Sequence, residues 1–344
     1  MPPKIIDLKP EKGMYADAAT QNLTLSEFLA KQELEKGFVP SKDTELDAYE
    51  RQLAAHGLKI TGKQVSLVED FYKTSASTVL FPEYINRQVR IGMEKSRNEC
   101  MIDDIIASTF TINSGSYESI YGTIDDDETG ARRVGEAAEF PVIIITVGEK
   151  PIKLRKIGHK VMLTYESIRR MAINRLNAHF QLIGARLRRN KVAWAIDVLI
   201  NGDGNTNPAG IYDHPILDYD GLVDFDFEFT DFAPTVYIAT SAGAKAILKL
   251  TEFKDPQAGF NYQKTGQMVS PMGVTLRQHS AVAADSLIGV DKSSALEMAM
   301  ETGASLIETE RVIDQQFEKA VISEVVGFSK IYTAAAKVWD YTDD

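Results

Sequence analysis

The most regular pattern of apolar positions lies between residues 164 and 200. Apolar side chains recur there every three or four residues, and no proline interrupts them. This spacing is typical of one face of an α-helix, which Thr164 can cap and which Asn201 and Gly202 can end. At 1.5 Å per residue, a single helix over 164–200 would measure roughly 55 Å. The apolar positions are Ile168, Ala172, Leu176, Phe180, Ile183, Leu187, Trp194 and Val198.

Strand-like patterns precede this helix. Residues 142–146 form a β-branched run, and apolar and polar positions then alternate through 152–163. An acidic run at 125–128, followed by Gly130, is typical of an exposed turn between two strands. We therefore predict a long two-stranded hairpin, which is too thin and too polar to form a core of its own.

The first 76 residues are polar and contain two short amphipathic patterns. Thr24 and Glu27 fit a capping box, and Gly37 is placed to end the helix that follows them. A second helix is predicted over 44–56, with Leu46, Tyr49 and Leu53 on one face. Neither helix would bury much by itself, so we interpret residues 1–76 as an arm that packs on other surfaces.

The remaining segments mix strand and helix signals. Pro82 is expected to open a helix that includes Ile85 and Val89, because proline is favoured at the first helical position. Beyond residue 204 we predict strands over 236–240, 269–278 and 287–290, a helix over 241–250, and further strands near the C-terminus.

Composition agrees with a folded protein that is neither basic nor membrane-spanning. The 344 residues are 44% hydrophobic and 25% charged, which is ordinary for globular domains. A net charge of −11 disfavours a general binder of nucleic acid or of anionic membranes. No apolar stretch approaches a membrane span, no signal peptide is visible, and Cys100 is the only cysteine. We expect a soluble protein made in the cytoplasm, without disulfides.

Charge is distributed unevenly along the chain. Residues 151–191 carry eleven basic side chains against the single Glu166, whereas residues 192–244 carry nine acidic side chains and no Lys or Arg. Three interpretations stay open: a solvated helix face followed by a solvated acidic loop, charge complementarity between subunits, or a basic helix that follows nucleic-acid phosphates. The third lacks interleaved aromatic residues.

Candidate chemistry is sparse. The segment 202–210, GDGNTNPAG, has Asp203, Asn205 and Asn207 at calcium-loop spacing, but Pro208 replaces the required glycine and His214 the bidentate glutamate. The five histidines lack metal-site spacing, and the acidic neighbours of Cys100 would raise its pKa. We predict no catalytic residue, no cofactor and no metal.

The order of these elements resembles the major capsid proteins of tailed bacteriophages, which share the Hong Kong 97-type fold. Four segments carry the resemblance, and they follow one another in the family's order. They are STVLFPEYINRQV, RRVGEAAEFPVIIITVGEKPIKLRKIGHKVMLTYESIRR, INGDGNTNPAGIYD and VYIATSAGAKAILKLTEFKDPQAG. The second is similar to the family's extended loop as it returns into the spine helix, and the third to the exit from that helix.

The resemblance implies an α+β capsid fold with four parts. The expected parts are an N-terminal arm at 1–76; a peripheral domain at 77–116, 160–203 and 320–344 that includes the spine helix at 164–200; an extended loop, or β-hairpin, at 117–159; and an axial domain at 204–319. Some relatives lose an N-terminal segment by proteolysis, but this arm is shorter and less helical than their scaffolding segments, so we expect it to stay uncleaved.

The implied function is structural. The resemblance implies self-assembly into pentamers and hexamers of an icosahedral shell around double-stranded DNA, which is bound without sequence specificity. Expected partners are further copies of the chain and portal, scaffold or decoration proteins, with no membrane, and the expected location is the virion after assembly in the host cytoplasm. The candidate contacts between subunits are Arg132, Arg133, Glu136, Glu139 and Arg155.

Two alternatives are kept. An encapsulin-type compartment shell would have the same fold but would enclose a cargo enzyme. A soluble α+β enzyme could instead place a carboxylate site in the acidic segment 213–231, with Asp218 and Asp220 as the residues to test.

Overall fold

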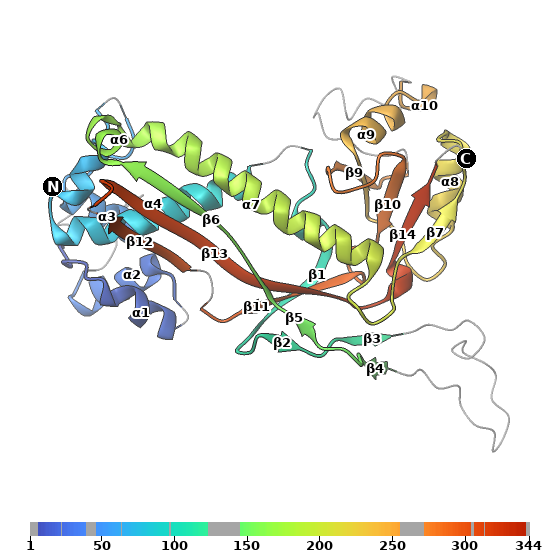
Figure 1. The fold of residues 1–344 in the computed structure, drawn as a ribbon, viewed down its shortest axis with the longest axis horizontal. Helices are drawn as coiled ribbons and strands as arrows, with labels where there is room; N and C mark the ends of the chain where they lie inside the picture. Colours follow the sequence, from blue (N-terminus) through green and yellow to red (C-terminus); the bar gives the residue numbers. More distant parts are fainter. Residues whose placement is uncertain are drawn as a thin grey trace, which may run out of the picture. The chain divides into compact units, whose positions relative to one another are not determined.

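The computed structural model describes residues 6–21, 23–38, 46–62, 64–95, 98–122, 145–254, 272–303, 306–312 and 314–341. The chain divides into two compact units, each assembled from segments that lie far apart in the sequence. Unit 1 comprises residues 1–95, 158–187 and 303–324, and unit 2 comprises residues 96–157, 188–302 and 325–344. Three elements continue from one unit into the other (Figure 1): strand β6 (Arg155–Thr164), helix α7 (Ile173–Asn201) and strand β13 (Phe317–Lys330).

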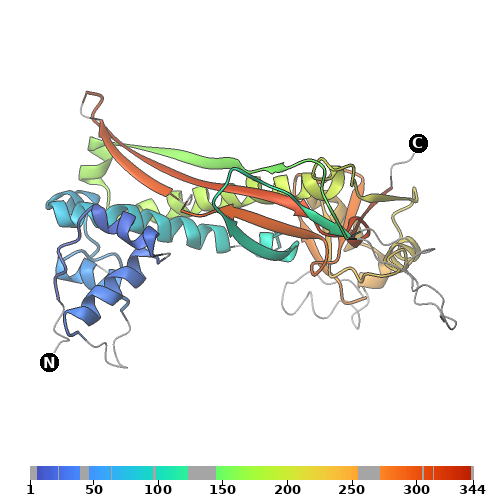
Figure 2. The same cartoon turned by 90° about the horizontal axis from the view of Figure 1, so that it is seen from below.

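Unit 1 begins with three short helices that pack together. They are α1 (Gly13–Thr20), α2 (Leu25–Glu35) and α3 (Ala48–Ala55), and they lie beside α4 (Ser75–Glu94) in Figure 2. The capping box of Thr24 and Glu27 is confirmed. The second helix starts later than predicted, because Asp47 supplies its cap, and Leu46 is left outside it and 43% exposed. The shared core consists of Leu8, Leu25, Leu29 and Ala48.

A buried polar network fixes these N-terminal helices to one another. The side chain of Glu33 on α2 accepts a hydrogen bond from Nε of Arg51 on α3 at 3.0 Å and one from Nε2 of Gln52 at 3.2 Å. Gln52 also accepts from the backbone N–H of Leu8 at 3.0 Å and donates to the carbonyl of Ile6 at 2.7 Å. Each polar group in this network therefore has a partner, as burial requires.

Helix α4 differs from its prediction, because it does not begin at Pro82. It begins at Ser75, where the hydroxyl of Thr74 accepts from the backbone N–H of Ser77 at 3.1 Å, and Pro82 lies buried inside it. A proline in a helix cannot donate to the carbonyl four residues earlier and disturbs the neighbouring hydrogen bonds. The interior position is tolerated here because other side chains bind the helix at this point.

Two tyrosines of the N-terminal helices supply those bonds. In an uninterrupted helix, the N–H of Glu83 would donate to the carbonyl of Val79. The Tyr15 hydroxyl lies between these groups, donating to the Val79 oxygen at 2.8 Å and accepting from Glu83 N–H at 3.2 Å. The Tyr49 hydroxyl donates to the carbonyl of Leu80 at 2.9 Å. A side chain inserted in this way is a recognised cause of helix bending.

The single helix predicted over 164–200 is wrong in one respect. The structure has α6 (Tyr165–Arg170) and then α7, separated by an extended Met171. The segment at 66–68 pairs with this break: Val68 N–H donates to the Met171 carbonyl at 3.0 Å, and Ile173 N–H to the Ser66 carbonyl at 3.1 Å. No proline or glycine marks the break, which tertiary pairing produces. Thr164 does cap α6, and Gly202 ends α7 with a φ of 86°.

Close helix packing and strand pairing complete unit 1. The backbones of α4 and α7 approach so closely that a Cβ at Gly92 would lie 2.1 Å from the Gln181 carbonyl oxygen, and a Cβ at Gly184 would lie 2.1 Å from that of Val89. Strand β12 (Leu306–Val312) pairs antiparallel with Phe317–Ser323 of β13, and β6 also pairs with β13. The short η1 (Val68–Tyr72) precedes α4.

Unit 2 contains a five-stranded sheet in the order β7-β14-β10-β8-β9. The predicted strands over 236–240 and 287–290 are confirmed, and the helix predicted over 241–250 ends earlier. Of the strand predicted over 269–278, residues 275–278 form a strand, whereas residues 272–274, which are also described, do not. The strands are β7 (Gly210–Asp213), β8 (Val236–Ala239), β9 (Thr275–Gln278), β10 (Ser286–Val290) and β14 (Ala336–Asp340); the helices are α9 (Ser241–Ile247) and α10 (Thr251–Lys254).

Part of the acidic segment is a helix rather than the solvated loop of the first charge interpretation. Helix α8 (Tyr219–Phe227) starts at Asp218, whose carboxylate accepts from Gly221 N–H at 2.7 Å. Leu222 and Phe225 on its inner face are fully buried, and the Phe225 ring lies 5.7 Å from that of Trp339. Two apolar residues among many carboxylates were too weak a pattern to predict the helix.

A second group of strands in unit 2 packs with the C-terminal half of α7. Strand β1 (Ile106–Ile112) pairs parallel with β11 (Leu296–Glu301), which pairs antiparallel with Val326–Lys330 of β13. Val192, Ile196 and Leu199 of α7 belong to the same buried cluster. The short helices η2 (Ile102–Asp104) and η3 (Thr333–Ala335) lie at the ends of these segments.

The base of the predicted hairpin is present. Strand β2 (Ser116–Tyr117) pairs antiparallel with β5 (Ile152–Lys153), and β3 (Ile120–Gly122) pairs antiparallel with β4 (Ile145–Val147). We refer to β2–β5 as the hairpin. The acidic run at 125–128 and the β-branched positions 142–144 lie outside the described residues.

Candidate inter-subunit surfaces

One anchor of the hairpin is the loop that follows α7. Asn205 accepts from the backbone N–H of Lys150 at 2.9 Å, and its amide nitrogen donates to the Lys150 carbonyl at 3.3 Å. The same nitrogen lies 3.4 Å from the Ser119 hydroxyl, on the opposite arm of the hairpin. The segment that resembled a calcium loop therefore holds the hairpin through a side-chain amide, and Asp203 accepts from the Asn205 backbone N–H at 3.1 Å.

A second anchor connects the hairpin to β13. The Tyr117 and Ser329 hydroxyls are 2.7 Å apart, and Ser329 donates to the Glu297 carboxylate at 2.8 Å. Burial raises the pKa of Glu297, against the opposing effect of the Ser329 hydrogen bond. Leu154 lies against Gly327, where an added Cβ would be 3.3 Å from its side chain. These contacts fix the hairpin base to its own chain.

A fully buried lysine lies beside this anchor. Lys330 donates from Nζ to the Leu199 carbonyl, in the last turn of α7, at 2.9 Å. Its backbone N–H donates to Asp203 at 3.2 Å. Burial lowers the pKa of Lys330 to about 8, although the nearby Asp203 opposes the change. A cation that satisfies carbonyls at a helix C-terminus is electrostatically favourable, but its removal from water is costly.

The hairpin exposes an apolar pair. Ile120 on β3 and Val147 on β4 lie directly opposite each other, and their exposed fractions are 58% and 54%. Two apolar side chains paired across strands normally stabilise a sheet by covering each other and a core beneath them. In this chain, more than half of each of these two side chains is exposed.

The five residues predicted as contacts between subunits fall into two groups. Arg155 is described: its guanidinium lies over the Trp194 ring, 5.2 Å from the centroid, and Trp194 packs edge-on to Phe328 at 5.1 Å. Arg155 thus has an intramolecular role at the hairpin base, and sequence spacing gave no sign of it. The remaining predicted contacts, Arg132, Arg133, Glu136 and Glu139, lie outside the described residues.

Part of the basic charge at 151–191 is neutralised within the chain. Glu99 binds both Arg188, which is buried, and Arg189, whose Nε lies 3.0 Å from a Glu99 oxygen. Although burial opposes it, the hydrogen bonds and charges of these arginines hold the pKa of Glu99 below its usual range. The same acidic residue therefore accounts for two of the eleven cations.

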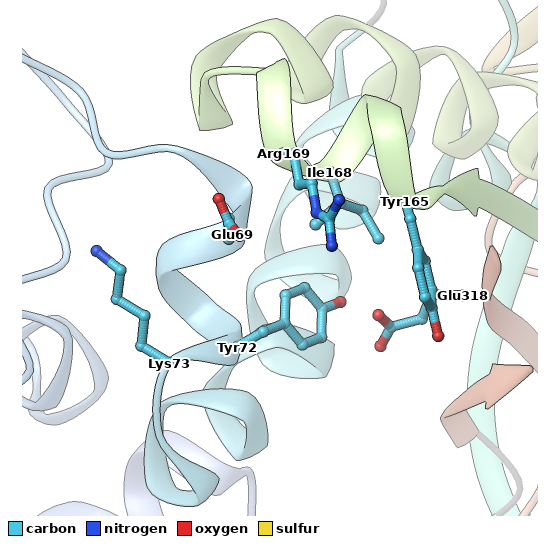
Figure 3. Close-up of a pocket in the computed structure, with 7 residues that line it drawn as sticks. All are labelled: Glu69, Tyr72, Lys73, Tyr165, Ile168, Arg169 and Glu318. Carbon is cyan, nitrogen blue, oxygen red and sulfur yellow. The ribbon is translucent and has the colours of Figure 1, made fainter. Parts of the chain in front are cut away.

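Two pockets among the described residues are alternative candidates for a functional site. The first, of about 310 Å³, lies in unit 1, and Figure 3 shows the side chains of Tyr72, Tyr165 and Glu318 pointing toward one another, with Arg169 above them. Its charged lining comprises two carboxylates and two cations, so it favours neither sign of ligand. The complete lining is Glu69, Tyr72, Lys73, Tyr165, Ile168, Arg169 and Glu318.

The second pocket, of about 340 Å³, lies in unit 2 beside Glu99 and Arg189. His279 contributes to its wall, and its Nε2 lies 3.2 Å from the Arg189 carbonyl oxygen. Burial lowers the pKa of His279, so the ring is neutral at pH 7. The two charged residues of the pocket, Glu99 and Arg189, already bind each other.

Two kinds of feature are absent from the described parts of the chain. No group of three or more His, Cys, Asp or Glu side chains there could hold a metal, and no helix there is long and apolar enough to cross a membrane. Asp218 caps α8, and burial, followed by the charge of Asp104, raises the pKa of the Cys100 thiol. Asp218 therefore stabilises the start of a helix, and Cys100 is a buried thiol.

Comparisons with known proteins identify the architecture. No protein-family model and no protein of curated function matches the chain. Among solved structures, the chain is similar to the capsid of the native GTA particle, with 14% identity, 73% of this chain and 94% of that chain covered, and a TM-score of 0.52. The chain has a phage capsid protein fold. The predicted Hong Kong 97-type α+β fold is confirmed.

Two further capsid-fold structures extend the comparison. A virus-like particle from Pyrococcus furiosus is 11% identical, with 75% of this chain and 98% of that chain covered and a TM-score of 0.50. The capsid of cyanophage P-SCSP1u is 10% identical, with 73% and 90% covered and a TM-score of 0.50. This chain therefore shares the capsid fold with structures whose sequences are only 10–14% identical to its own. The division into arm, peripheral domain, extended loop and axial domain stays a prediction.

Proposed function

We propose that this chain is the major capsid subunit of a tailed bacteriophage, a non-catalytic protein that assembles as pentamers and hexamers into an icosahedral shell around double-stranded DNA. The capsid fold supports a shell protein, and the exposed pair of Ile120 and Val147 on the anchored hairpin carries the argument for self-association. The proposed location is the virion.

The hairpin is expected to be only marginally stable in a single subunit. A two-stranded ribbon is marginally stable in water, because each strand lacks a second neighbour and much of its apolar surface stays wet. In this chain the base is held by Asn205, Tyr117 and Ser329, while the apolar pair beyond it is exposed. A neighbouring subunit that covered the pair would remove this surface from water and favour assembly.

The electrostatic balance is compatible with an enclosed genome. A net charge of −11 gives the subunit no general attraction to DNA phosphates, so DNA can be packed and released without tight binding to the wall. The proposal includes portal, scaffold or decoration proteins as further partners, as in the phage family that the sequence resembles.

The test is assembly of the expressed chain, alone and with a scaffold protein, followed by electron microscopy. Closed shells are expected from the wild-type chain, and Ile120→Ser with Val147→Thr should greatly reduce their number while the melting temperature of the unassembled subunit stays unchanged. The paired change Ile91→Ser with Leu34→Thr, at two other exposed apolar positions, is the control. A wild-type chain that stays monomeric under every condition would contradict the proposal.

A compartment shell that encloses a cargo enzyme is the second candidate. Its support is the similarity to the virus-like particle, with a TM-score close to that of the GTA capsid. The contents of particles purified from the natural source separate the two candidates. Nuclease-protected double-stranded DNA would support the phage subunit, whereas a stoichiometric protein cargo without DNA would support the compartment.

A further inference from the structure

The outer face of helix α8 carries an ordered acidic ridge. Asp220, Asp224 and Phe227 are separated by four and three residues, so they lie one above another on the same face of the helix. All three are exposed, and Phe227 is the most exposed large apolar side chain in the described chain, at 77%. Within those described residues, neither aspartate forms an ion pair. We call these three residues the acidic ridge.

Buried side chains on the opposite face of α8 hold the acidic ridge in place. Phe225 and Leu222 on the opposite face of α8 are fully buried, and Phe225 packs against Tyr237 with ring centroids 5.8 Å apart. Gly221 lies so close to Trp339 that an added Cβ would be 3.0 Å from the indole ring. A helix held in this way presents the ridge as a rigid surface, so binding would cost little conformational entropy.

A complementary ridge lies on helix α7. Arg175, His179, Leu182 and Arg186 are separated by four, three and four residues, and all are exposed in the structure. Leu182, at 48% exposure, lies between the two arginines. The sequence from 167 to 196 contains no acidic residue, and the part of the chain that the structure describes provides no ion-pair partner for Arg175 or Arg186. We call these four residues the basic ridge.

The two ridges match in charge, apolar content and length. Each combines charges of one sign with a single large exposed apolar side chain. At 1.5 Å per residue, the acidic ridge extends over roughly 10 Å and the basic ridge over roughly 16 Å, so the shorter surface fits within the longer. Opposite charges around an apolar contact fix the register of an interface and accelerate its formation.

Resting on the proposed self-assembly, we propose that the acidic ridge of one subunit docks on the basic ridge of a second copy of this chain. The ridges have the same spacing when the helices are parallel, so Phe227 would contact Leu182, Asp224 would face His179 and Asp220 would face Arg175. Arg186 would flank the apolar contact on its other side. The occupant is a second copy because both ridges are exposed within a single chain. Charge complementarity between subunits, the second interpretation of the uneven charge, would then depend on the seven residues of the two ridges.

Charge reversal followed by charge exchange tests the pairing. Asp220→Lys with Asp224→Lys should slow assembly, measured by light scattering, by on the order of tenfold or more, and Arg175→Glu with Arg186→Glu should do the same. The four changes together should restore most of the wild-type rate, because the ridges would again be opposite in sign. The control is Asp213→Lys with Asp231→Lys, which changes the net charge equally at exposed positions off the ridge.

The outcomes are distinct. Failure of the wild-type chain to form shells would contradict the proposed function. If the wild type forms normal shells, three results would each overturn the ridge pairing alone. They are unaffected assembly of the charge-reversed variants, an equal effect of the control variant, and no rescue by the charge exchange. Melting curves of the unassembled variants establish that each one folds.

A disulfide measurement does not depend on charge. In a chain with Phe227→Cys and Leu182→Cys, oxidation of assembled shells should give disulfide-linked oligomers, since the native Cys100 is buried and unavailable. Ile216→Cys with Leu182→Cys, which places one thiol at an exposed position outside the ridge, should not link. If the first of these two variants forms normal shells but gives no linked oligomers on oxidation, the pairing is overturned.

Discussion

The N-terminal helices, α1–α3, and the hairpin both need other surfaces on which to bury their apolar side chains, but they differ in where those surfaces lie. Neither can bury enough apolar surface by itself. The N-terminal helices find their surfaces within unit 1, where Leu29 and Tyr49 are fully buried and Tyr15 binds α4. The hairpin is fixed at its base but leaves Ile120 and Val147 exposed. The difference separates a segment completed by its own chain from one that, under the proposed function, is completed by assembly.

The two regions also differ in how polar groups are used. The N-terminal helices bury the charged pair of Glu33 and Arg51, so a local change there affects folding. The hairpin is held by exposed or half-buried hydrogen bonds from Asn205 and Tyr117, so a change beyond its base leaves the core intact.

Shortening the hairpin should have the largest effect. Because Gly122 pairs with Ile145, a two-residue Asn-Gly turn can replace residues 123–144 and join β3 directly to β4. We expect the free energy of unfolding to change by less than about 1 kcal/mol, since no described core contact is removed. We expect no shells by electron microscopy. Normal shells from this variant would show that the comparison between the two regions is wrong.

Removing Glu33 should destabilise the subunit strongly. Glu33→Ala leaves the buried Arg51 without its carboxylate, and breaking one side of a buried pair typically costs about 3–5 kcal/mol. Denaturant unfolding of the unassembled subunit measures this loss. Glu35→Ala, at an exposed position on the same helix, should change the free energy of unfolding by less than about 0.5 kcal/mol. Equal effects of the two changes would argue against a buried network.

The buried Lys330 should make stability depend on pH. Its folded pKa of about 8 lies below the ordinary 10.5, so the unfolded chain binds more protons between these values and stability rises with pH. Relative to Lys330→Met, the wild-type free energy of unfolding should gain roughly 3 kcal/mol between about pH 8 and about pH 10.5. Unfolding curves of both proteins across this range test it. A constant difference would mean that Lys330 keeps its ordinary pKa.

The Tyr15 hydroxyl should have a smaller effect. Tyr15→Phe removes the bridge between the Val79 carbonyl and the Glu83 N–H, and the loss of a partner for buried polar groups costs about 1–3 kcal/mol. Hydrogen exchange should accelerate at Glu83 more than at the ends of α4. Tyr219→Phe, for which no described hydrogen bond is lost, is the control. Unchanged exchange at Glu83 would contradict the bridging role.

Sequence reasoning succeeded where one local pattern governs an element. The capping box at Thr24, the strand at Val236–Ala239 and the pairing at the hairpin base follow from such patterns. It failed where a distant segment decides. Pro82 was expected to open a helix but lies inside one, because Tyr15 and Tyr49 bind the helix at this point.

The same distinction applies to the candidate surfaces. Arg155 stays a predicted contact between subunits, and the structure adds its intramolecular neighbour Trp194, which only folding brings to it. The acidic segment was visible as a charge run, whereas the order of Asp220, Asp224 and Phe227 along one face needed the helix boundaries of α8.

The sequence by itself determined the fold class, the order of elements and the uneven charge, because periodicity, capping and net charge are properties of neighbouring residues. Tertiary structure alone decided where the long helix breaks at Met171, how α4 accommodates Pro82 and which of the described charges stay unpaired at the surface. These features depend on contacts between residues far apart in the sequence, and the free energy of such contacts is not encoded in any local pattern.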